Sequence, residues 1–286
     1  MNLNDFLPYN FLGLSVISLW INKKITPYLV ILTILIGLYF GRITLIGLSG
    51  IFLVGLSFWC FQKNSKKWIR VLSGLIFFGI AYLLFSHIYP GFNNLKVFDN
   101  YQFSEMSSPF TMYMNFDKPF ISLVCFYLLG VDKGFTSLDF WKKIIIIAPL
   151  AVIFLLGPAI GINYLKWDFK FDPNMLVWGI NNLIFVCAAE EVIFRRVIQG
   201  GLSSKLESLH KHGPWIALIL ASILFGLAHF KGGVSYILLS TIAGIFYGYS
   251  YKTTKSIEAS ILVHFFVNSF HIVFLTYPYV GTVYGN

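Results

Sequence analysis

Two adjacent carboxylates lie inside an apolar run in the second half of the chain, within the sequence EEVIFR at residues 190–195. A charge in an apolar helix is expensive, about 2.5–3.5 kcal/mol at the centre of a bilayer. Glu191 and Arg195 are four residues apart, so they share a helix face and can pair. Glu190 lies about 100° round the helix, where its neighbours at helical spacing are apolar. A carboxyl in that setting can accept and donate a proton near neutral pH.

Two histidines and an asparagine follow on later apolar runs. His229 ends the sequence FGLAH, which begins at Phe225, while His264 and Asn268 are four residues apart on one helix face. His271 lies on that face as well, one to two turns further on. A single polar residue in a membrane helix more often joins two helices than performs chemistry. Together, on three helices of one C-terminal bundle, these groups predict a polar site suited to a reaction that uses water.

The composition excludes a soluble domain as the main body of this 286-residue chain. Hydrophobic residues make up 57% and charged residues only 12%, about half the charged share of ordinary soluble domains. The net charge of +9 does not predict nucleic-acid binding, because the basic residues form short clusters between apolar runs. That distribution is typical of membrane topology signals. The three cysteines have neither metal-site nor disulfide spacing.

The apolar runs predict an all-α fold, a polytopic transmembrane bundle of about 8–10 helices that lies in a lipid bilayer. The expected spans are Phe6–Ile21, Pro27–Phe40, Ile43–Phe61, Trp68–Tyr89, Phe120–Val131, Ile144–Leu165, Met175–Gln199, Pro214–Phe230, Val234–Tyr251 and Ile257–Tyr277. Phe120–Val131 is the weakest, and it could cross or re-enter. If all ten cross, fifteen basic residues face one side and six the other, which predicts an outside N-terminus.

Ionisable groups divide the chain into two parts. Residues 1–165 have almost none within their spans and predict an N-terminal transmembrane scaffold of unknown role. Residues 174–277 have one in nearly every span and predict a four-helix catalytic core. Within that core, Ser240, Gly244 and Gly248 repeat every four residues, a pattern that lets membrane helices approach closely.

The motifs EExxxR, FxxxH and HxxxN, in this order and each on its own apolar run, resemble those of the CAAX protease and bacteriocin-processing family, also called the Abi family. Its members are glutamate-type intramembrane proteases. The matching residues are Glu190, Glu191 and Arg195, then Phe225 and His229, then His264 and Asn268. The resemblance covers about a third of the chain, roughly from Asn181 to Phe270.

The resemblance implies that Glu190 is the general base that activates a water, with His229 sharing the task. His264 and Asn268 would donate hydrogen bonds to the oxyanion, and the pair of Glu191 and Arg195 would orient the site. Such chemistry needs a base and preorganised donors, with no serine or cysteine nucleophile. No cofactor is implied. The expected partner is a protein or peptide substrate with a membrane-embedded or lipid-modified segment.

Three alternatives remain open. A zinc-dependent protease could use His229, His264 and a glutamate as ligands, although no HExxH motif is present. A non-enzymatic protein could act in bacteriocin immunity, as a membrane partner, or as a transporter that relays protons through its buried Glu and His. The peptide bond hydrolysed could lie in a C-terminal tag, a CAAX-like tail or a peptide leader. The short loops favour the plasma membrane of a prokaryote as the location.

Overall fold

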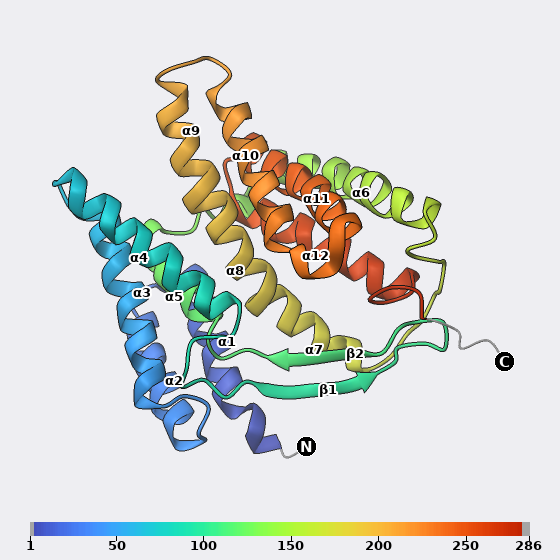
Figure 1. Ribbon diagram of the computed structural model, residues 1–286, viewed down its shortest axis with the longest axis horizontal. Coiled ribbons are helices and arrows are strands. Elements are labelled where there is room, and N and C mark those ends of the chain that lie inside the picture. The colour runs from blue at the N-terminus through green and yellow to red at the C-terminus, as the bar shows by residue number, and fades with distance from the viewer. Residues whose placement is uncertain (1–2, 282–286) are drawn as a thin grey trace. The chain divides into compact units, whose positions relative to one another are not determined.

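A computed structural model of the protein describes residues 3–281, and within them the predicted all-α fold class is confirmed. Each of the ten predicted spans is helical. The helices are α1 (Leu7–Ile21), α2 (Thr26–Tyr39), α3 (Leu45–Lys63), α4 (Lys67–Phe85), α5 (Pro119–Leu129), α6 (Leu138–Gly161), α7 (Asn174–Ile180), α8 (Ala188–Glu191), α9 (Gly200–Glu207), α10 (Gly213–Ala228), α11 (Gly233–Thr254) and α12 (Ile257–Phe274) (Figure 1). Short 3₁₀ turns lie at Leu3–Phe6, Gly134–Thr136 and Phe230–Gly232.

The helices confirm that this is a multi-pass membrane protein. Within the described residues, six helices are long and apolar enough to cross a bilayer. They are Leu45–Lys63, Lys67–Phe85, Leu138–Gly161, Asn174–Glu207, Phe230–Thr254 and Ile257–Phe274. Thr26–Tyr39, Pro119–Leu129 and Gly213–Ala228 are shorter apolar helices.

A β-hairpin between α4 and α5 was not predicted. Strand β1 (Leu95–Tyr101) pairs with β2 (Phe110–Met114). Both strands are rich in aromatic and β-branched residues, which favour extended structure. The segment contains no apolar run, so its hydropathy pattern predicts no element there.

The described residues divide into two compact units. The first comprises residues 3–97, 112–131 and 184–189. In it, α1 and α2 pack as one hairpin, α3 and α4 as another, and α5 contacts α1 and α3. Hydroxyl pairs join the first hairpin: Ser18 Oγ lies 2.7 Å from Thr26 Oγ1, and Ser15 Oγ lies 3.0 Å from Thr33 Oγ1. Such hydrogen bonds hold helices together where lipid removes the hydrophobic driving force.

The second unit comprises residues 98–111, 132–183 and 190–281. Here α6 packs on α11 and α12, and α11 packs on α10 and α12 (Figure 1). The sequence division at residue 165 therefore differs from the packing, because α6 lies with the C-terminal helices rather than with the N-terminal ones. The roles assigned to the two parts stay predictions.

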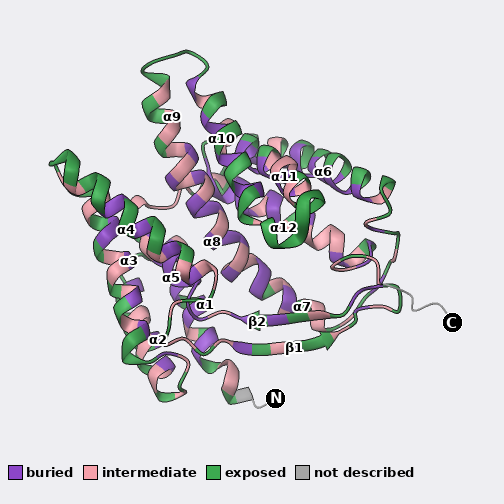
Figure 2. Cartoon of the chain, viewed as in Figure 1, coloured by how far each residue is buried: buried purple, intermediate pink, exposed green. Residues whose placement is uncertain are grey.

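One continuous helix runs through Asn174–Glu207 and carries the paired carboxylates. It extends eight residues beyond the predicted end at Gln199, because the polar segment 200–207 remains helical after the apolar run stops. Two π-helical segments, Asn181–Cys187 and Val192–Gln199, flank the four α-helical residues of α8. Figure 2 shows that the stretch around α8 is largely buried. π-Helical turns are rare and are common at functional sites.

Polar contacts hold both ends of α12. At its N-terminus, Asp132 Oδ2 accepts the Ile257 N–H at 2.9 Å, and Asp132 also pairs with Arg196 at 2.7 Å. At its C-terminus, the loop after α6 satisfies the last carbonyls: Asp168 N–H donates to Phe274 O at 2.8 Å. A carboxylate at the N-terminus and amide donors at the other end both suit the helix dipole.

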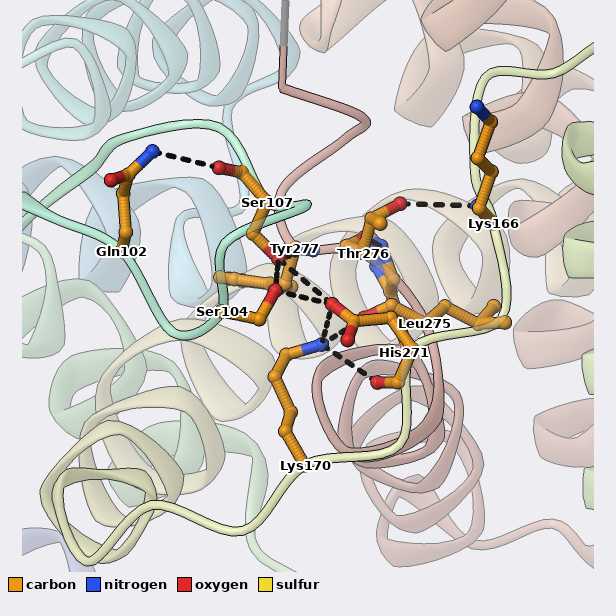
Figure 3. Close-up of polar contacts among 10 residues, drawn as sticks. Gln102, Ser104, Ser107, Lys166, Lys170, His271, Leu275, Thr276 and Tyr277 are labelled. Carbon is orange, nitrogen blue, oxygen red and sulfur yellow. Dashed lines mark hydrogen bonds and ion pairs between the residues drawn. The ribbon is translucent and has the colours of Figure 1, made fainter. Parts of the chain in front are cut away.

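A buried ion pair reinforces the C-terminal contact (Figure 3). Lys170 Nζ lies 3.1 Å from Asp168 Oδ2 and also donates to the Leu275 carbonyl. The Asp168 carboxylate accepts hydrogen bonds from Ser104 Oγ and Ser107 Oγ of the hairpin loop. The Asp168 and Lys170 side chains are only 9% and 7% exposed. This cluster, which we call the C-terminal latch, joins the hairpin loop, the α6–α7 loop and α12.

The latch also bears on the weak span. Its contacts bring the hairpin loop and the α6–α7 loop together, so both segments lie on one side of the membrane. The helix α5 between them has 11 residues, fewer than the roughly 20 that a full crossing needs. Whether Phe120–Val131 crosses or re-enters therefore stays a prediction.

The latch makes stability depend on pH. Burial acts to raise the pKa of Asp168, but hydrogen bonds from Ser104 and Lys170 and the Lys170 charge outweigh it and hold the pKa below its ordinary value. A carboxyl with a lowered pKa contributes stability above its unfolded pKa of 3.8, and this contribution is lost as the pH falls further.

Asp168→Asn should lower the free energy of unfolding by about 3–5 kcal/mol at pH 7, because Lys170 stays buried without its counter-charge. Unfolding in mixed micelles would measure the loss. The difference from wild type should shrink as the pH falls from 3.8 through the lowered pKa of folded Asp168, at which the folded protein itself becomes protonated there. Asp99→Asn, at an exposed hairpin position, is the matched control. A loss that stayed constant down to low pH would contradict the role of the ion pair.

Candidate active site

Glu190 and His229 face each other across the contact between the long helix and α10. Glu190 Oε2 lies 3.9 Å from His229 Nε2, and their side chains are 12% and 22% exposed. The other ring nitrogen, Nδ1, lies 2.7 Å from the Phe225 carbonyl oxygen. A neutral His229 therefore carries its proton on Nδ1 and turns the Nε2 lone pair toward Glu190.

The two groups also lie at the same level in the unit. The long helix and α10 are packed neighbours joined by a short turn. Glu190 is 17 residues before the end of the long helix at Glu207, and His229 is 16 residues after the start of α10 at Gly213. At about 1.5 Å per residue, both lie roughly 25 Å from the turn.

Glu191 is the centre of a buried polar cluster. Its Oε2 accepts a hydrogen bond from Arg195 Nε at 2.8 Å and another from Ser260 Oγ. Its Oε1 lies 2.9 Å from His264 Nδ1. Glu191 and Arg195 are fully buried, and the pairing that the spacing predicted is present. The cluster joins the long helix directly to α12.

Two aromatic rings hold the histidines. Tyr247 stacks on His264 with 4.5 Å between ring centroids and an angle of 16°. Phe225 lies 4.7 Å from His229 and 5.8 Å from His264, so the first residue of the FxxxH motif separates the two histidine rings. The Arg195 guanidinium lies 5.1 Å from the centre of the Phe225 ring, a cation–π distance.

Asn268 lies one turn beyond His264 on α12. Its Nδ2 donates to Asn182 Oδ1 at 3.2 Å. His271, one turn further on, places Nε2 3.0 Å from the Thr276 carbonyl oxygen. Thus α12 carries His264, Asn268 and His271 on the cavity side, as the spacing predicted.

A cavity of about 80 Å³ lies beside these residues. Its wall includes His229, His264, Asn268, Tyr236 and Ser240. A water molecule needs about 10–15 Å³ of such space and two to four polar partners, so this polar cavity can hold several waters. Glu190 is not part of its wall, but the His229 ring that faces Glu190 is.

Sequence reasoning missed three residues of this site. Ser260 precedes His264 by four residues and Asn182 precedes Glu190 by eight, so helical spacing alone could have suggested both. Tyr247 lies in the small-residue run, where the pattern drew attention to the glycines beside it. Neither Tyr247 nor Asn182 belongs to a motif that indicated chemistry.

Glycines set the distance between α10 and α11. A Cβ at Gly244 would lie 3.0 Å from Ser222 Cα, and one at Gly248 would lie 2.7 Å from Gln199 Oε1. On α10, a Cβ at Gly226 would overlap the Thr241 hydroxyl and lie 2.7 Å from the Ile237 carbonyl oxygen. The close approach that the small-residue pattern predicted is thus present.

The arrangement does not by itself form a metal site. Among residues 3–281, no group of three or more His, Cys, Asp and Glu side chains is placed to hold a metal ion. His229 and His264 share one feature with histidines that bind metals. In each, Nδ1 lies within hydrogen-bond distance of an oxygen, which is the usual second contact of a histidine that ligates a metal.

A family model matches the part of the chain that contains this site. Residues 172–270 match the model of the Type II CAAX prenyl endopeptidase Rce1-like family. A protein of Bacillus subtilis (strain 168) named "Putative membrane peptidase YdiL" is 30% identical over 89 residues. That match spans 31% of this chain and 33% of the relative. No solved structure matches. The resemblance to the CAAX protease family is therefore confirmed over the segment that carries all three motifs.

Gly226→Ala should destabilise the protein by about 1–3 kcal/mol, because its Cβ has no room against α11. It should also move His229, which lies three residues on and whose N–H donates to Gly226 O. Unfolding in mixed micelles would measure the change. Gly157→Ala is the matched control, since a Cβ there meets nothing within 4 Å. Equal stability of the two variants would contradict the packing argument.

Proposed function

We propose that this protein is an intramembrane endopeptidase that hydrolyses a peptide bond with a water activated by Glu190. The proposal rests on one observation: Glu190 Oε2 and His229 Nε2 face each other at a distance of 3.9 Å, beside a polar cavity. That separation is too long for a direct hydrogen bond. It leaves both groups able to contact one water. The family match and the resemblance to a membrane peptidase support the same class of reaction.

The reaction proceeds in two steps. Glu190 accepts a proton from the water, aided by His229, as the water oxygen attacks the peptide carbonyl carbon. The tetrahedral intermediate carries its negative charge on the former carbonyl oxygen. When the intermediate collapses, the C–N bond breaks and protonated Glu190 gives the proton to the leaving amine. The immediate products are a carboxylic acid and an amine, and Glu190 returns to its ionised form. The acid then gives its proton to the amine or to water, which leaves a carboxylate.

His264 and Asn268 donate hydrogen bonds to that oxyanion. Asn268 Nδ2 has two N–H groups, and Asn182 takes one of them. His264 Nδ1 is engaged by Glu191, so Nε2 can donate only when the ring is doubly protonated. Glu191 already accepts from Arg195 and Ser260, which favours its ionised form. An ionised Glu191 stabilises an imidazolium at His264, much as a buried aspartate supports a catalytic histidine.

The assignment is also consistent in charge. It takes Glu190 and Glu191 as negative in the resting site, and Arg195 and a doubly protonated His264 as positive. The four charges cancel, as burial in an apolar unit demands. When the proton moves to Glu190 and the negative charge appears on the oxyanion, the sum stays zero.

The substrate is a peptide segment within or beside the membrane, because the cavity lies inside a helical unit whose outer surface is apolar. Such a segment would belong to a membrane-embedded or lipid-modified protein. A C-terminal tag, a CAAX-like tail and a peptide leader all fit this description. The location that follows is a plasma membrane, as the short loops indicate.

Glu190→Gln should abolish hydrolysis, a loss of about 10²–10⁴-fold for removal of a general base. The substrate need not be known in advance. Membranes containing wild type or variant are incubated in H₂¹⁸O, and new C-termini are identified by mass spectrometry. Each wild-type product should carry one ¹⁸O in its new carboxylate. Glu105→Gln, at an exposed hairpin position, is the matched control.

If the same new termini formed at full rate with Glu190→Gln, the proposed base would be wrong. A bacteriocin-immunity or transport activity that survived Glu190→Gln would favour the non-enzymatic alternative. Metal analysis and exhaustive chelation address the zinc-dependent version. Stoichiometric zinc, with activity lost on chelation and restored by zinc, would favour that version over the one proposed.

Asn268→Ala should lower kcat by about 10²–10³-fold with little change in KM, because an oxyanion donor acts on the transition state. Once a substrate is in hand, steady-state kinetics in vesicles would separate the two constants. Asn174→Ala, on the same unit but at the start of the long helix, is the control. An increase in KM at unchanged kcat would instead make Asn268 a substrate-binding residue.

A further inference from the structure

The first unit contains a groove that the proposed reaction does not use. The groove has a volume of about 320 Å³, and its lining is almost wholly apolar. It lies between the start of α2, the part of α3 from Ile51 to Trp59 and almost the whole length of α5. Val30, Gly55, Trp59, Val124 and Tyr127 are among its lining residues. The volume is at the low end of the roughly 300–1,000 Å³ typical of small-molecule pockets, enough for a length of hydrocarbon chain.

The predicted topology puts the polar rim of the groove on the inner side. With the N-terminus outside, as the basic residues predict, α2 begins on the inner side and α3 ends there. In that orientation the rim is at the level of the inner leaflet, where acyl chains meet their headgroups.

The inner end of this unit is strongly basic. Its loops and helix ends carry six cations: Lys23, Lys24, Lys63, Lys66, Lys67 and Arg70. The described part of the unit has two acidic residues, Asp5 and Asp117. Both lie at the outer end, where Asp5 pairs with Arg42 and Asp117 contacts His87. No carboxylate of this unit therefore opposes the inner cations.

One cation lies directly at the groove. The ammonium of Lys23 lies 4.7 Å from the centre of the Tyr127 ring, and Tyr127 lines the groove. Lys23 is exposed, so its charge remains available at the rim. Lys63 follows the lining residue Trp59 by four residues on α3 and is exposed as well. A basic rim above an apolar groove matches an anionic headgroup above an acyl chain.

We propose that this groove is a binding site for an anionic phospholipid of the inner leaflet, with an acyl chain against Gly55 and Val124 and the phosphate at Lys23. The apolar groove alone would accept the chain of any lipid. The charge at its rim selects the anionic one.

Bromine atoms on an acyl chain quench tryptophan fluorescence at short range, so Trp59 reports occupancy of the groove. Full-length protein is placed in phosphatidylcholine vesicles that contain a small fraction of brominated phosphatidylglycerol. A parallel sample contains the same fraction of brominated phosphatidylcholine. The part of the quenching that is lost in the Trp59→Phe variant is assigned to lipid bound in the groove. We expect phosphatidylglycerol to give more of this quenching than phosphatidylcholine at equal mole fraction.

Two variants test the two parts of the site. Gly55→Leu should fill the groove and remove the excess quenching. A Cβ at Gly55 meets only Val124, at 4.0 Å, so the chain has room for the substitution. Gly79→Leu on α4, where a Cβ meets nothing within 4 Å, is the matched control and should keep the excess. Lys23→Gln should weaken phosphatidylglycerol binding about five-fold, the effect of removing one cation near an anionic lipid.

Equal quenching by the two lipids would overturn the proposal, since the groove would then be a general lipid contact. An excess that survived both Gly55→Leu and Lys23→Gln would overturn it too, because the anionic lipid would bind elsewhere. Lys23→Gln changes an exposed loop residue. It therefore decides the question even if Gly55→Leu fails to fold.

Discussion

The buried carboxylate of Glu191 is the interaction on which the second unit depends. A charge that is fully removed from both water and lipid headgroups must have its hydrogen bonds satisfied by protein. Arg195 supplies one, and Ser260 and His264 supply two from α12. Loss of Arg195 would leave an uncompensated charge in the core, and loss of Ser260 or His264 would leave a buried carboxylate oxygen short of a hydrogen bond. The long helix and α12 therefore have little freedom to slide past each other, and the position of His264 is fixed by electrostatics as much as by packing.

The neighbouring helices α10 and α11 help to shield the buried Glu191 carboxylate and its partners. Phe225 and Tyr247 cover the polar cluster with aromatic rings, which keeps its dielectric low while leaving the histidine edges at the cavity. They can do so only because α10 and α11 approach closely at Gly226 and Gly244. A larger residue at either position would separate the rings from the histidines. Glycine is needed here for its small volume, since close contact replaces the hydrophobic effect as the force between membrane helices.

The sequence predicted the helices well and the polar contacts only in part. Lipid as a solvent demands apolar runs of a definite length, so spans such as Trp68–Tyr89 could be recognised within a few residues of their true ends. Charge in an apolar run is rare enough to predict the pairing of Glu191 with Arg195. By contrast, Asn182 and Ser260 are ordinary residues until another helix brings a partner to them. The π-helical turns around α8 and the hairpin strands do not produce the apolar runs from which the helices were predicted.

The largest difference concerned α6, which the sequence grouped with the N-terminal spans because the apolar run predicted there, Ile144–Leu165, contains no charged residue. The residues that flank α6 explain why it packs with the C-terminal helices. Asp132 before α6 accepts a hydrogen bond from the first turn of α12, and Lys170 after α6 donates to the last carbonyls of α12. An anion thus lies at the positive end of the α12 dipole and a cation at its negative end. Because α6 packs on α12, the segments that flank α6 can deliver both charges. His264 and Asn268 lie between two fixed ends, and a site whose elements are held in this way can keep its donors in place while a substrate enters beside them.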